Sequence, residues 1–281
     1  MATLVVSPHL DDAVLSLGAT IHRWVSAGER VVIASMYTRG PALDEVPRSM
    51  RKFADYRTRL AEDRAACAVI GAERRTMGCI ERAFRRPFLT GTQYFTTPAD
   101  RSGFGALSKV TAALDELLEL DAERIVLPMG IGNHVDHVET MVAATDWAAT
   151  NKLTARVWFY EDFYALSDVM RRQHPIARRR RWKPWQAPLL RARRLSVILG
   201  AVAAGRRGPP IDQLLSARWR KARWTVEPQD ITDHEAAKLA AIQRYPSQTK
   251  AFGGYAGIAR ALVAYHRFWG GAEPLWRATA R

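Results

Sequence analysis

The sequence is poor in cysteine and has no long apolar run. Only Cys67 and Cys79 occur among 281 residues, and their spacing forms no metal-ligand pair. Such sparse use argues against a disulfide framework and predicts a reducing, cytoplasmic location. There is no stretch of about 18 uncharged apolar residues, so we predict no transmembrane helix. Residues 1–8 have neither a basic region nor a cleavage site, which predicts a strand rather than a signal peptide.

Acidic residues are absent from one segment. Residues 169–211 contain 12 Lys or Arg and no Asp or Glu, so the net charge of +14 falls to +2 for the rest of the chain. Between Arg171 and Arg194, Trp182 and Trp185 are interleaved with the basic residues. No nucleic-acid motif accompanies them, and we expect no nucleic-acid partner. An anionic-membrane or phosphate contact through residues 171–194 and a solvated loop stay open as alternatives.

Apolar residues make up 48% of the chain, enough for one sizeable α/β domain. Their patterning alternates between strands and helices along residues 1–160, which predicts a Rossmann-like α/β fold of three layers with a mainly parallel sheet. We expect a core over residues 1–168, a basic insertion over 169–211, and a helical part over 212–281 that completes the same domain. The predicted strands are residues 3–7, 30–37, 124–127 and 156–160, and the predicted helices include 55–70, 103–120, 135–150, 232–245 and 256–268.

Polar side chains with metal-binding chemistry follow two of these strands. In an open α/β sheet, ligands bind beyond the carboxyl ends of the strands. If the two strands are neighbours, both clusters meet at one edge. An Asp-Asp pair after a strand is often only a helix N-cap, and surface histidines are common, but two such clusters at two strand ends favour a metal site. The clusters are His9, Asp11 and Asp12, and then His134, Asp136 and His137.

The residue types match a catalytic zinc site, which takes three protein ligands and keeps a position for water. His9, Asp12 and His137 would supply two imidazoles and a carboxylate. Bound zinc lowers the pKa of its water to about 7, and Asp11 is the candidate base beside it. His134 would face the scissile carbonyl from one helical turn before His137, and Asp136 would hydrogen-bond a histidine ring.

The segments around both clusters resemble a known family. SPHLDDAVLSLG (residues 7–18) and GNHVDH (residues 132–137) are similar to the two signatures of the PIG-L / LmbE-like metal-dependent N-deacetylases. Arg59-Leu60-Ala61-Glu62 is similar to an RxxE element of the family, and Tyr245-Pro246-Ser247-Gln248 resembles a YxSQ segment of some members. The resemblance covers roughly residues 1–165 and is much weaker beyond.

The resemblance implies a ligand set and roles for this chain. His9, Asp12 and His137 would bind zinc, with another divalent metal such as Fe²⁺ as the alternative. Asp11 would be the general base, and His134 would stabilise the oxyanion or act as acid while Asp136 tunes it. Ser16 and Arg59 would line the substrate pocket. Many members have an acidic residue where this chain has Ala13, so the surroundings of the metal differ.

The expected activity is hydrolysis of the acetamide of an N-acetyl amino sugar or its conjugate, so the expected partner is a small N-acetylated glycoside or glycoconjugate. Glu81 follows a short strand near residues 75–77, so it would bind sugar hydroxyls or form a surface ion pair with a neighbouring arginine. Two other functions stay open: hydrolysis of a longer N-acyl amide, and binding without catalysis. The oligomeric state is open as well.

Overall fold

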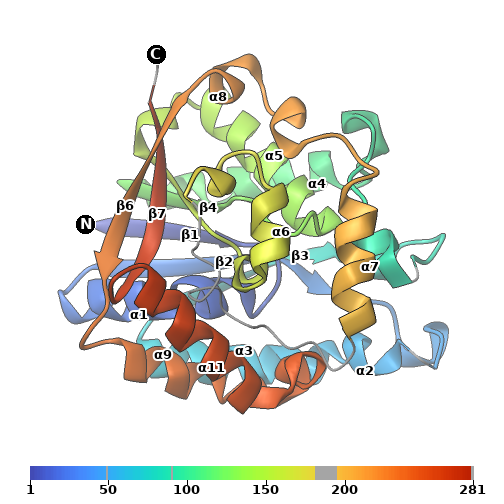
Figure 1. Cartoon of the computed structure of the whole chain (residues 1–281), viewed down its shortest axis with the longest axis horizontal. Helices are drawn as coiled ribbons and strands as arrows, with labels where there is room; N and C mark the ends of the chain where they lie inside the picture. Colours follow the sequence, from blue (N-terminus) through green and yellow to red (C-terminus); the bar gives the residue numbers. More distant parts are fainter. Residues whose placement is uncertain (49, 90, 181–194, 280–281) are drawn as a thin grey trace.

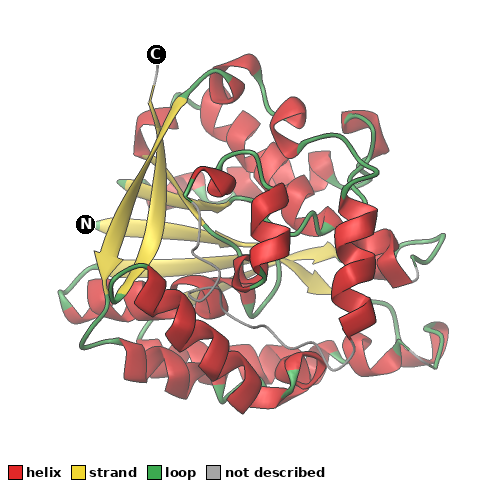
Figure 2. Ribbon diagram, viewed as in Figure 1, coloured by secondary structure: helices red, strands yellow, loops and turns green. Residues whose placement is uncertain are grey.

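The computed structural model describes residues 1–48, 50–89, 91–180 and 195–279. Within them, seven strands form one sheet in the order β3-β2-β1-β4-β5-β7-β6 (Figure 2). The first five strands of this order are parallel, whereas β7 pairs antiparallel with both β5 and β6. The strands are β1 (Ala2–Ser7), β2 (Arg30–Arg39), β3 (Glu73–Ile80), β4 (Arg124–Pro128), β5 (Val157–Tyr160), β6 (Arg223–Asp230) and β7 (Ala272–Thr279).

Helices cover both faces of the sheet (Figure 1). One layer contains α1 (Asp12–Ser26), α3 (Tyr56–Ile70), α9 (Glu235–Ile242) and α11 (Gly254–Phe268), and the other contains α4 (Leu107–Asp115) and α5 (Val135–Thr150). The predicted three-layer α/β fold is therefore confirmed. The remaining helices are α2 (Arg51–Ala54), α6 (Asp168–Gln173), α7 (Leu195–Gly205), α8 (Ala217–Arg220) and α10 (Pro246–Thr249).

The central strands are buried along their whole apolar stretches. Residues 3–7 of β1 and 31–38 of β2 are all buried, with no alternation between faces. This pattern is typical of a parallel sheet covered on both sides by helices. Because the interior of the fold is closed in this way, chemistry is confined to the strand ends.

The C-terminal part differs from the helical segment that we expected. The two predicted helices are present as α9 and α11, but the same part also contributes β6 and β7, which extend the sheet. Pro228 and Pro274 face each other across these strands. Proline inside a run argues against a strand, but it is tolerated near a sheet edge, where fewer N–H donors are needed.

The helix predicted over residues 232–245 is shorter in the structure, where α9 spans Glu235–Ile242. The helix begins at Glu235 with His234 at its N-cap. The carboxylate of Asp230 accepts hydrogen bonds from both the backbone N–H and the hydroxyl of Thr232, at 3.0 and 2.7 Å. This local turn occupies the hydroxyl that would otherwise cap the helix, because short polar side chains compete with helix formation in this way. The helix predicted over 103–120 is also shorter, since α4 spans Leu107–Asp115.

The basic segment is described only in part. Residues 181–194, including Trp182 and Trp185, lie outside the described residues, so the contact predicted for 171–194 stays a prediction there. Its first arginine, Arg171, is not a surface charge: it is buried and pairs with Glu161 at 2.8 Å. Within the described residues, no helix is both long enough and apolar enough to cross a bilayer.

Candidate active site

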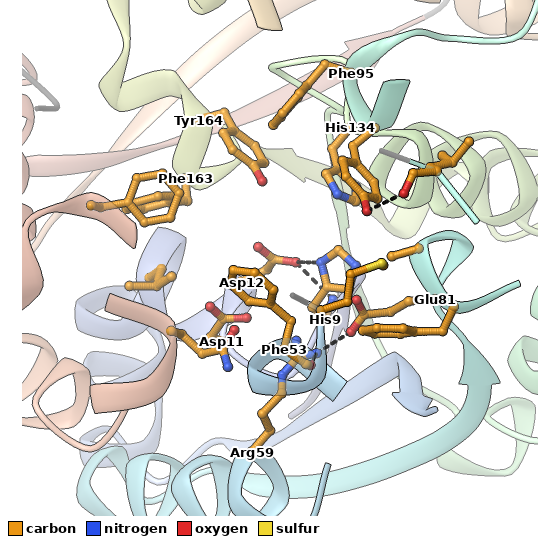
Figure 3. A pocket seen from close by; sticks show the side chains of 18 of the residues that line it. His9, Asp11, Asp12, Phe53, Arg59, Glu81, Phe95, His134, Phe163 and Tyr164 are labelled. Atoms are coloured by element: carbon orange, nitrogen blue, oxygen red, sulfur yellow. Dashed lines mark hydrogen bonds and ion pairs between the residues drawn. The ribbon is translucent and has the colours of Figure 1, made fainter. Parts of the chain in front are cut away.

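The two polar clusters of the sequence lie side by side. β1 pairs with β4 in parallel register, Val5 opposite Val126, so both strands end at the same edge of the sheet. His9, Asp11 and Asp12 follow β1, and His134 to His137 follow β4 and open helix α5. Figure 3 shows His9, Asp11, Asp12 and His134 facing one cavity. The expected meeting of the clusters is what the fold produces, because a parallel sheet aligns its carboxyl ends.

The turn after β1 is held by its own side chains. The hydroxyl of Ser7 donates to the carbonyl of His9 at 2.6 Å and accepts from the backbone N–H of Ala13 at 3.0 Å. Oδ2 of Asp12 accepts from the backbone N–H of His9 at 2.9 Å and lies 3.0 Å from Nδ1 of its ring. The turn thus presents an imidazole and a carboxylate together at the start of α1.

Three histidines form a triangle at the strand ends. The ring centroids of His9, His134 and His137 are 5.1 Å apart in every pair. One nitrogen from each ring lies within 4.8 Å of the others, a spacing at which one metal ion can be shared. Oδ2 of Asp12 borders the triangle at 3.1 Å from Nε2 of His137. A second group with the same spacing consists of His9, Glu81 and Asp136.

His137 is oriented by a carboxylate from the next strand. Its Nδ1 lies 2.7 Å from Oδ1 of Asp162, which directly follows β5, and the other oxygen of Asp162 accepts from the backbone N–H of Ile131. All three residues are buried. The carboxylate keeps the Nδ1 proton in place and leaves Nε2 to face Asp12, an arrangement typical of metal-binding histidines. The sequence analysis missed Asp162.

Asp136 faces His9 rather than His134. Its Oδ2 lies 3.3 Å from Nε2 of His9, and it accepts hydrogen bonds from the backbone N–H of Arg82 and from the guanidinium of Arg85. Arg85 also donates to Glu139 at 2.8 Å. The expectation that Asp136 hydrogen-bonds a histidine ring agrees with this geometry. Burial raises the pKa of the Asp136 carboxyl, but the hydrogen bond with His9 and, less strongly, the charge of Arg85 lower it overall.

The electrostatics of the site favour a cation. Burial lowers the pKa of His9, but the nearby carboxylates of Glu81, Asp12 and Asp136 raise it well above its usual value. Burial likewise opposes a charge on His137, whereas Asp12 and Asp162 raise the pKa of its ring to about 9. Both imidazoles are therefore cationic at neutral pH, which shows that the surrounding carboxylates demand positive charge at this place.

The pKa of His134 is shifted in the opposite direction. Burial and the charges of His9 and His137 lower the pKa of its ring to about 3. It is the N-cap residue of α5, and its ring lies nearly parallel to those of Tyr94 and Tyr164, at centroid distances of 6.3 and 6.1 Å. Its Nδ1 is buried and has no hydrogen-bond partner among the described residues. His134 is therefore a neutral imidazole with free hydrogen-bonding capacity.

Asp11 faces the cavity beside the triangle of His9, His134 and His137. Burial and the charge of Asp12 raise the pKa of its carboxyl to about 6, although the guanidinium of Arg59 lowers it. Arg59 and Glu81 also line the cavity, and they form a buried ion pair at 2.5 Å. The Arg59–Glu81 pair is thus an ion pair as one alternative expected, but it lies inside the pocket wall rather than on the surface.

Ser16 lies apart from the cavity lining. Its hydroxyl is buried and has no hydrogen-bond partner among the described residues, and its carbonyl accepts from the ammonium of Lys238 at 3.1 Å. Lys238 in turn forms a buried ion pair with Glu273 at 2.6 Å. This network fastens α9 to α1 and β7.

The RxxE and YxSQ elements meet in space. Ser247 donates to Glu62 through its hydroxyl at 2.6 Å and through its backbone N–H at 3.0 Å. The hydroxyl of Tyr245 lies 3.1 Å from the carbonyl of Leu10 and 3.1 Å from Asp63. The C-terminal part therefore supports the turn that presents Asp11 and Asp12, and Gln248 reaches the cavity.

The donor set fits a divalent metal. Nε2 of His137 is buried and makes no hydrogen bond among the described residues, although Oδ2 of Asp12 lies 3.1 Å away. An imidazole nitrogen facing a carboxylate oxygen at this distance requires a proton or a shared cation. Imidazole and carboxylate ligands suit zinc and iron, and the histidines provide the nitrogen ligands that calcium and magnesium rarely take.

Comparisons with known proteins agree with this geometry. Among solved structures, a triple-mutant deacetylase involved in teicoplanin biosynthesis superposes with a TM-score of 0.69 at 18% identity, covering 100% of this chain and 99% of that chain. The deacetylase of the A40926 pseudoaglycone superposes with 0.65 at 19% identity, over 99% and 97%. The N,N'-diacetylchitobiose deacetylase of Pyrococcus horikoshii superposes with 0.56 at 14% identity, over 99% and 84%. These likenesses establish a shared fold.

No curated protein matches this sequence. The model of the PIG-L family, described as GlcNAc-PI de-N-acetylase, matches residues 4–148. The match includes both polar clusters and confirms the resemblance that their sequences suggested. Because it spans more than half of the sequence, the chain belongs to the PIG-L family.

Proposed function

We propose that the chain is a zinc-dependent N-deacetylase that hydrolyses the acetamide of an N-acetyl amino sugar or its conjugate. The observation that carries the proposal is the triangle of His9, His134 and His137, with Asp12 at its edge and Asp11 beside it in the cavity. The family match supports de-N-acetylation, and three structures of the same fold are a deacetylase of teicoplanin biosynthesis, the A40926 pseudoaglycone deacetylase and an N,N'-diacetylchitobiose deacetylase.

In this proposal His9, Asp12 and His137 hold the metal. Zinc supplies a Lewis acid and lowers the pKa of a bound water. Asp162 orients His137 through Nδ1, and Asp136 occupies the second nitrogen of His9. Iron in the ferrous state fits the same ligands and is the alternative metal.

Asp11 acts as the general base on the attacking water. Its carboxyl faces the cavity, and a base works best when its pKa is close to the working pH. The raised pKa of about 6 therefore suits Asp11 both to accept the proton and to return it to the leaving amine.

His134 stabilises the oxyanion rather than donating the proton. A ring whose pKa is lowered to about 3 stays neutral, so it offers an N–H donor but is a poor acid. A dication held by His9 and His137 would take the place of the protons on these rings and would repel a charge on His134 in the same way. A preorganised neutral donor in a buried site stabilises developing negative charge on the carbonyl oxygen.

The test measures metal content and acetate release for three proteins. Asp11→Asn should keep its zinc and lose turnover by about 10²-fold or more, the size of a general-base contribution. His137→Ala should lose the metal itself. Near-normal acetate release by Asp11→Asn would refute the assigned base, and stoichiometric zinc without hydrolysis of any N-acyl sugar by the wild type would favour a binding protein.

A further inference from the structure

The cavity above the metal-binding triangle is much larger than an acetamide. Its volume is about 490 Å³, which is in the range of pockets that enclose drug-sized ligands. His9, Asp11, Asp12 and His134 form its polar floor at the strand ends (Figure 3). The rest of the substrate must therefore contact the walls, and the chemistry of the walls selects it.

The walls are apolar and largely aromatic, and they come from five separate segments of the chain. Phe53 lies on α2 and Phe84 on the turn 82–84, while Phe95 ends the turn 91–95. Phe163 and Phe252 come from the turns after β5 and before α11, and they pack edge to face at 5.0 Å. Figure 3 shows Phe53, Phe95 and Phe163 around the polar floor. A substrate gains binding free energy from such walls by burying its own apolar surface against them.

Among its described lining residues, the same cavity has no Lys or Arg that lacks a carboxylate partner. Arg59 is the one Lys or Arg among them, and its Nη1 is engaged by Glu81 at 2.5 Å and by the carbonyl of Phe53 at 3.2 Å. Asp11, Asp12 and Glu81 are carboxylates. A metal dication would offset two of these charges. A phosphate or carboxylate on the substrate would therefore enter without a counter-charge, at a high desolvation cost.

Unpaired arginines lie at a different place. Arg178 and Arg206 are exposed and line a separate hollow with Asp212 and Asn133, and neither forms an ion pair within the described residues. This hollow is polar, and none of its lining residues also lines the cavity above His134. These two unpaired arginines thus lie outside the cavity in which the acetamide would react.

We infer that this site takes an uncharged amino sugar whose apolar substituent, alkyl or aromatic, lies against the phenylalanine walls. The inference rests on the proposed deacetylation and adds the substrate class to it. An apolar group of this kind has two sources, an aglycone on the anomeric oxygen or a longer chain on the N-acyl group. The aglycone and the longer acyl chain would present the same kind of apolar surface to the walls, and the experiment below distinguishes between them.

The experiment compares four compounds with the zinc-loaded full chain. They are the methyl and octyl glycosides of N-acetylglucosamine, the methyl glycoside of N-octanoylglucosamine, and N-acetylglucosamine 1-phosphate. Release of the free amine gives kcat/KM for each compound. We expect one of the two octyl compounds to exceed the methyl N-acetyl compound by about tenfold or more, the effect of burying about 60 Å² of apolar surface. The compound that gains identifies the source of the apolar group.

Phe53 provides the matched variant, because its side chain is 41% exposed at the cavity and its replacement carries little risk to folding. Phe53→Ser should lower kcat/KM for the preferred octyl compound about threefold or more relative to the value for the methyl N-acetyl compound. Leu118→Ser is the control, since Leu118 is 40% exposed and does not line the cavity. It should change neither value.

Equal rates for the methyl and octyl compounds, or a preference for the 1-phosphate, would overturn the inference while leaving deacetylation intact. If no compound is hydrolysed, the proposed activity fails, and calorimetry on the same zinc-loaded proteins still decides the inference. Tighter binding of an octyl compound that is weakened by Phe53→Ser supports it, and equal binding of the methyl and octyl compounds refutes it.

Discussion

Asp162 lies 2.7 Å from Nδ1 of His137, and the two residues come from neighbouring strand ends 25 positions apart. The carboxylate fixes which ring nitrogen of His137 carries the proton. Nε2 then faces Asp12, where the proposed metal binds. One buried acidic side chain thus decides whether a histidine can act as a ligand.

Asp162→Asn should weaken metal binding by about 10- to 100-fold, the usual effect of losing such a partner. The amide nitrogen can only donate, so placing it against Nδ1 moves the ring proton to Nε2. Zinc affinity is measured by competition with a chelator. Asp121→Asn is the control, because the side chain of Asp121 is 88% exposed and should leave affinity unchanged. Equal affinities for both variants would contradict the role of Asp162.

Glu81→Gln should lower the free energy of unfolding by about 3 kcal/mol, since it leaves the buried guanidinium of Arg59 without a carboxylate. The double variant Arg59→Met with Glu81→Leu should lose less, because both charges leave the interior together. Urea denaturation measures both. For comparison, Glu73→Gln breaks the exposed pair with Arg30 and should cost less than about 1 kcal/mol. A double variant less stable than Glu81→Gln would refute this account.

Tyr245→Phe should destabilise the protein by about 1–3 kcal/mol. The hydroxyl lies 3.1 Å from both the Leu10 carbonyl and Asp63, and its loss leaves a buried acceptor without a donor. Because Leu10 belongs to the turn that presents Asp11, kcat should fall as well. Thermal unfolding and acetate release are the two measurements. Tyr255→Phe, at a partly exposed position of α11, serves as the comparison. A similar loss of stability and of kcat in Tyr255→Phe would contradict a special role for Tyr245.

His174 should make the fold sensitive to acid. Burial, and then the charges of Arg171 and Arg178, lower the pKa of its ring to about 3, although the carbonyl of Met129 raises it. The ring lies 2.9 Å from that carbonyl through Nε2, and Nδ1 accepts from the backbone N–H groups of residues 176 and 177. Only a neutral ring can make both contacts.

Because the ring is neutral in the folded protein, the free energy of unfolding should fall as the pH is lowered. The folded pKa lies below the unfolded value of about 6.5, so the stabilisation is complete above pH 6.5 and is lost as the pH falls toward 3. At pH 5 the loss is about 2 kcal/mol, or 1.36 kcal/mol per pH unit. His174→Gln should be less stable at pH 7.5 but should lose less on acidification. An unchanged pH slope in His174→Gln would refute the assignment.

Much of the site could be predicted from the strand-end rule applied to local patterns. The strands before His9 and His134 are short apolar runs, and the turns after them concentrate residues of metal-binding type. The same rule, applied to β5, would have found Asp162, which directly follows Val157–Tyr160 as the second residue of Glu161-Asp162. Asp162 was missed because acidic residues that follow a strand without a neighbouring histidine form no distinctive motif.

Local patterns along the chain were enough to predict the β-α-β alternation, the two polar clusters and the family, since periodicity and spacing are properties of neighbouring residues. The contacts between distant segments became known only from the tertiary structure. It brought Asp162 to His137 and the phenylalanines of five segments around one cavity, and it added β6 and β7 to the sheet. Contacts between distant segments depend on how the layers pack. In the C-terminal part, prolines occupy strand positions, so no local pattern predicted that β6 and β7 would pair.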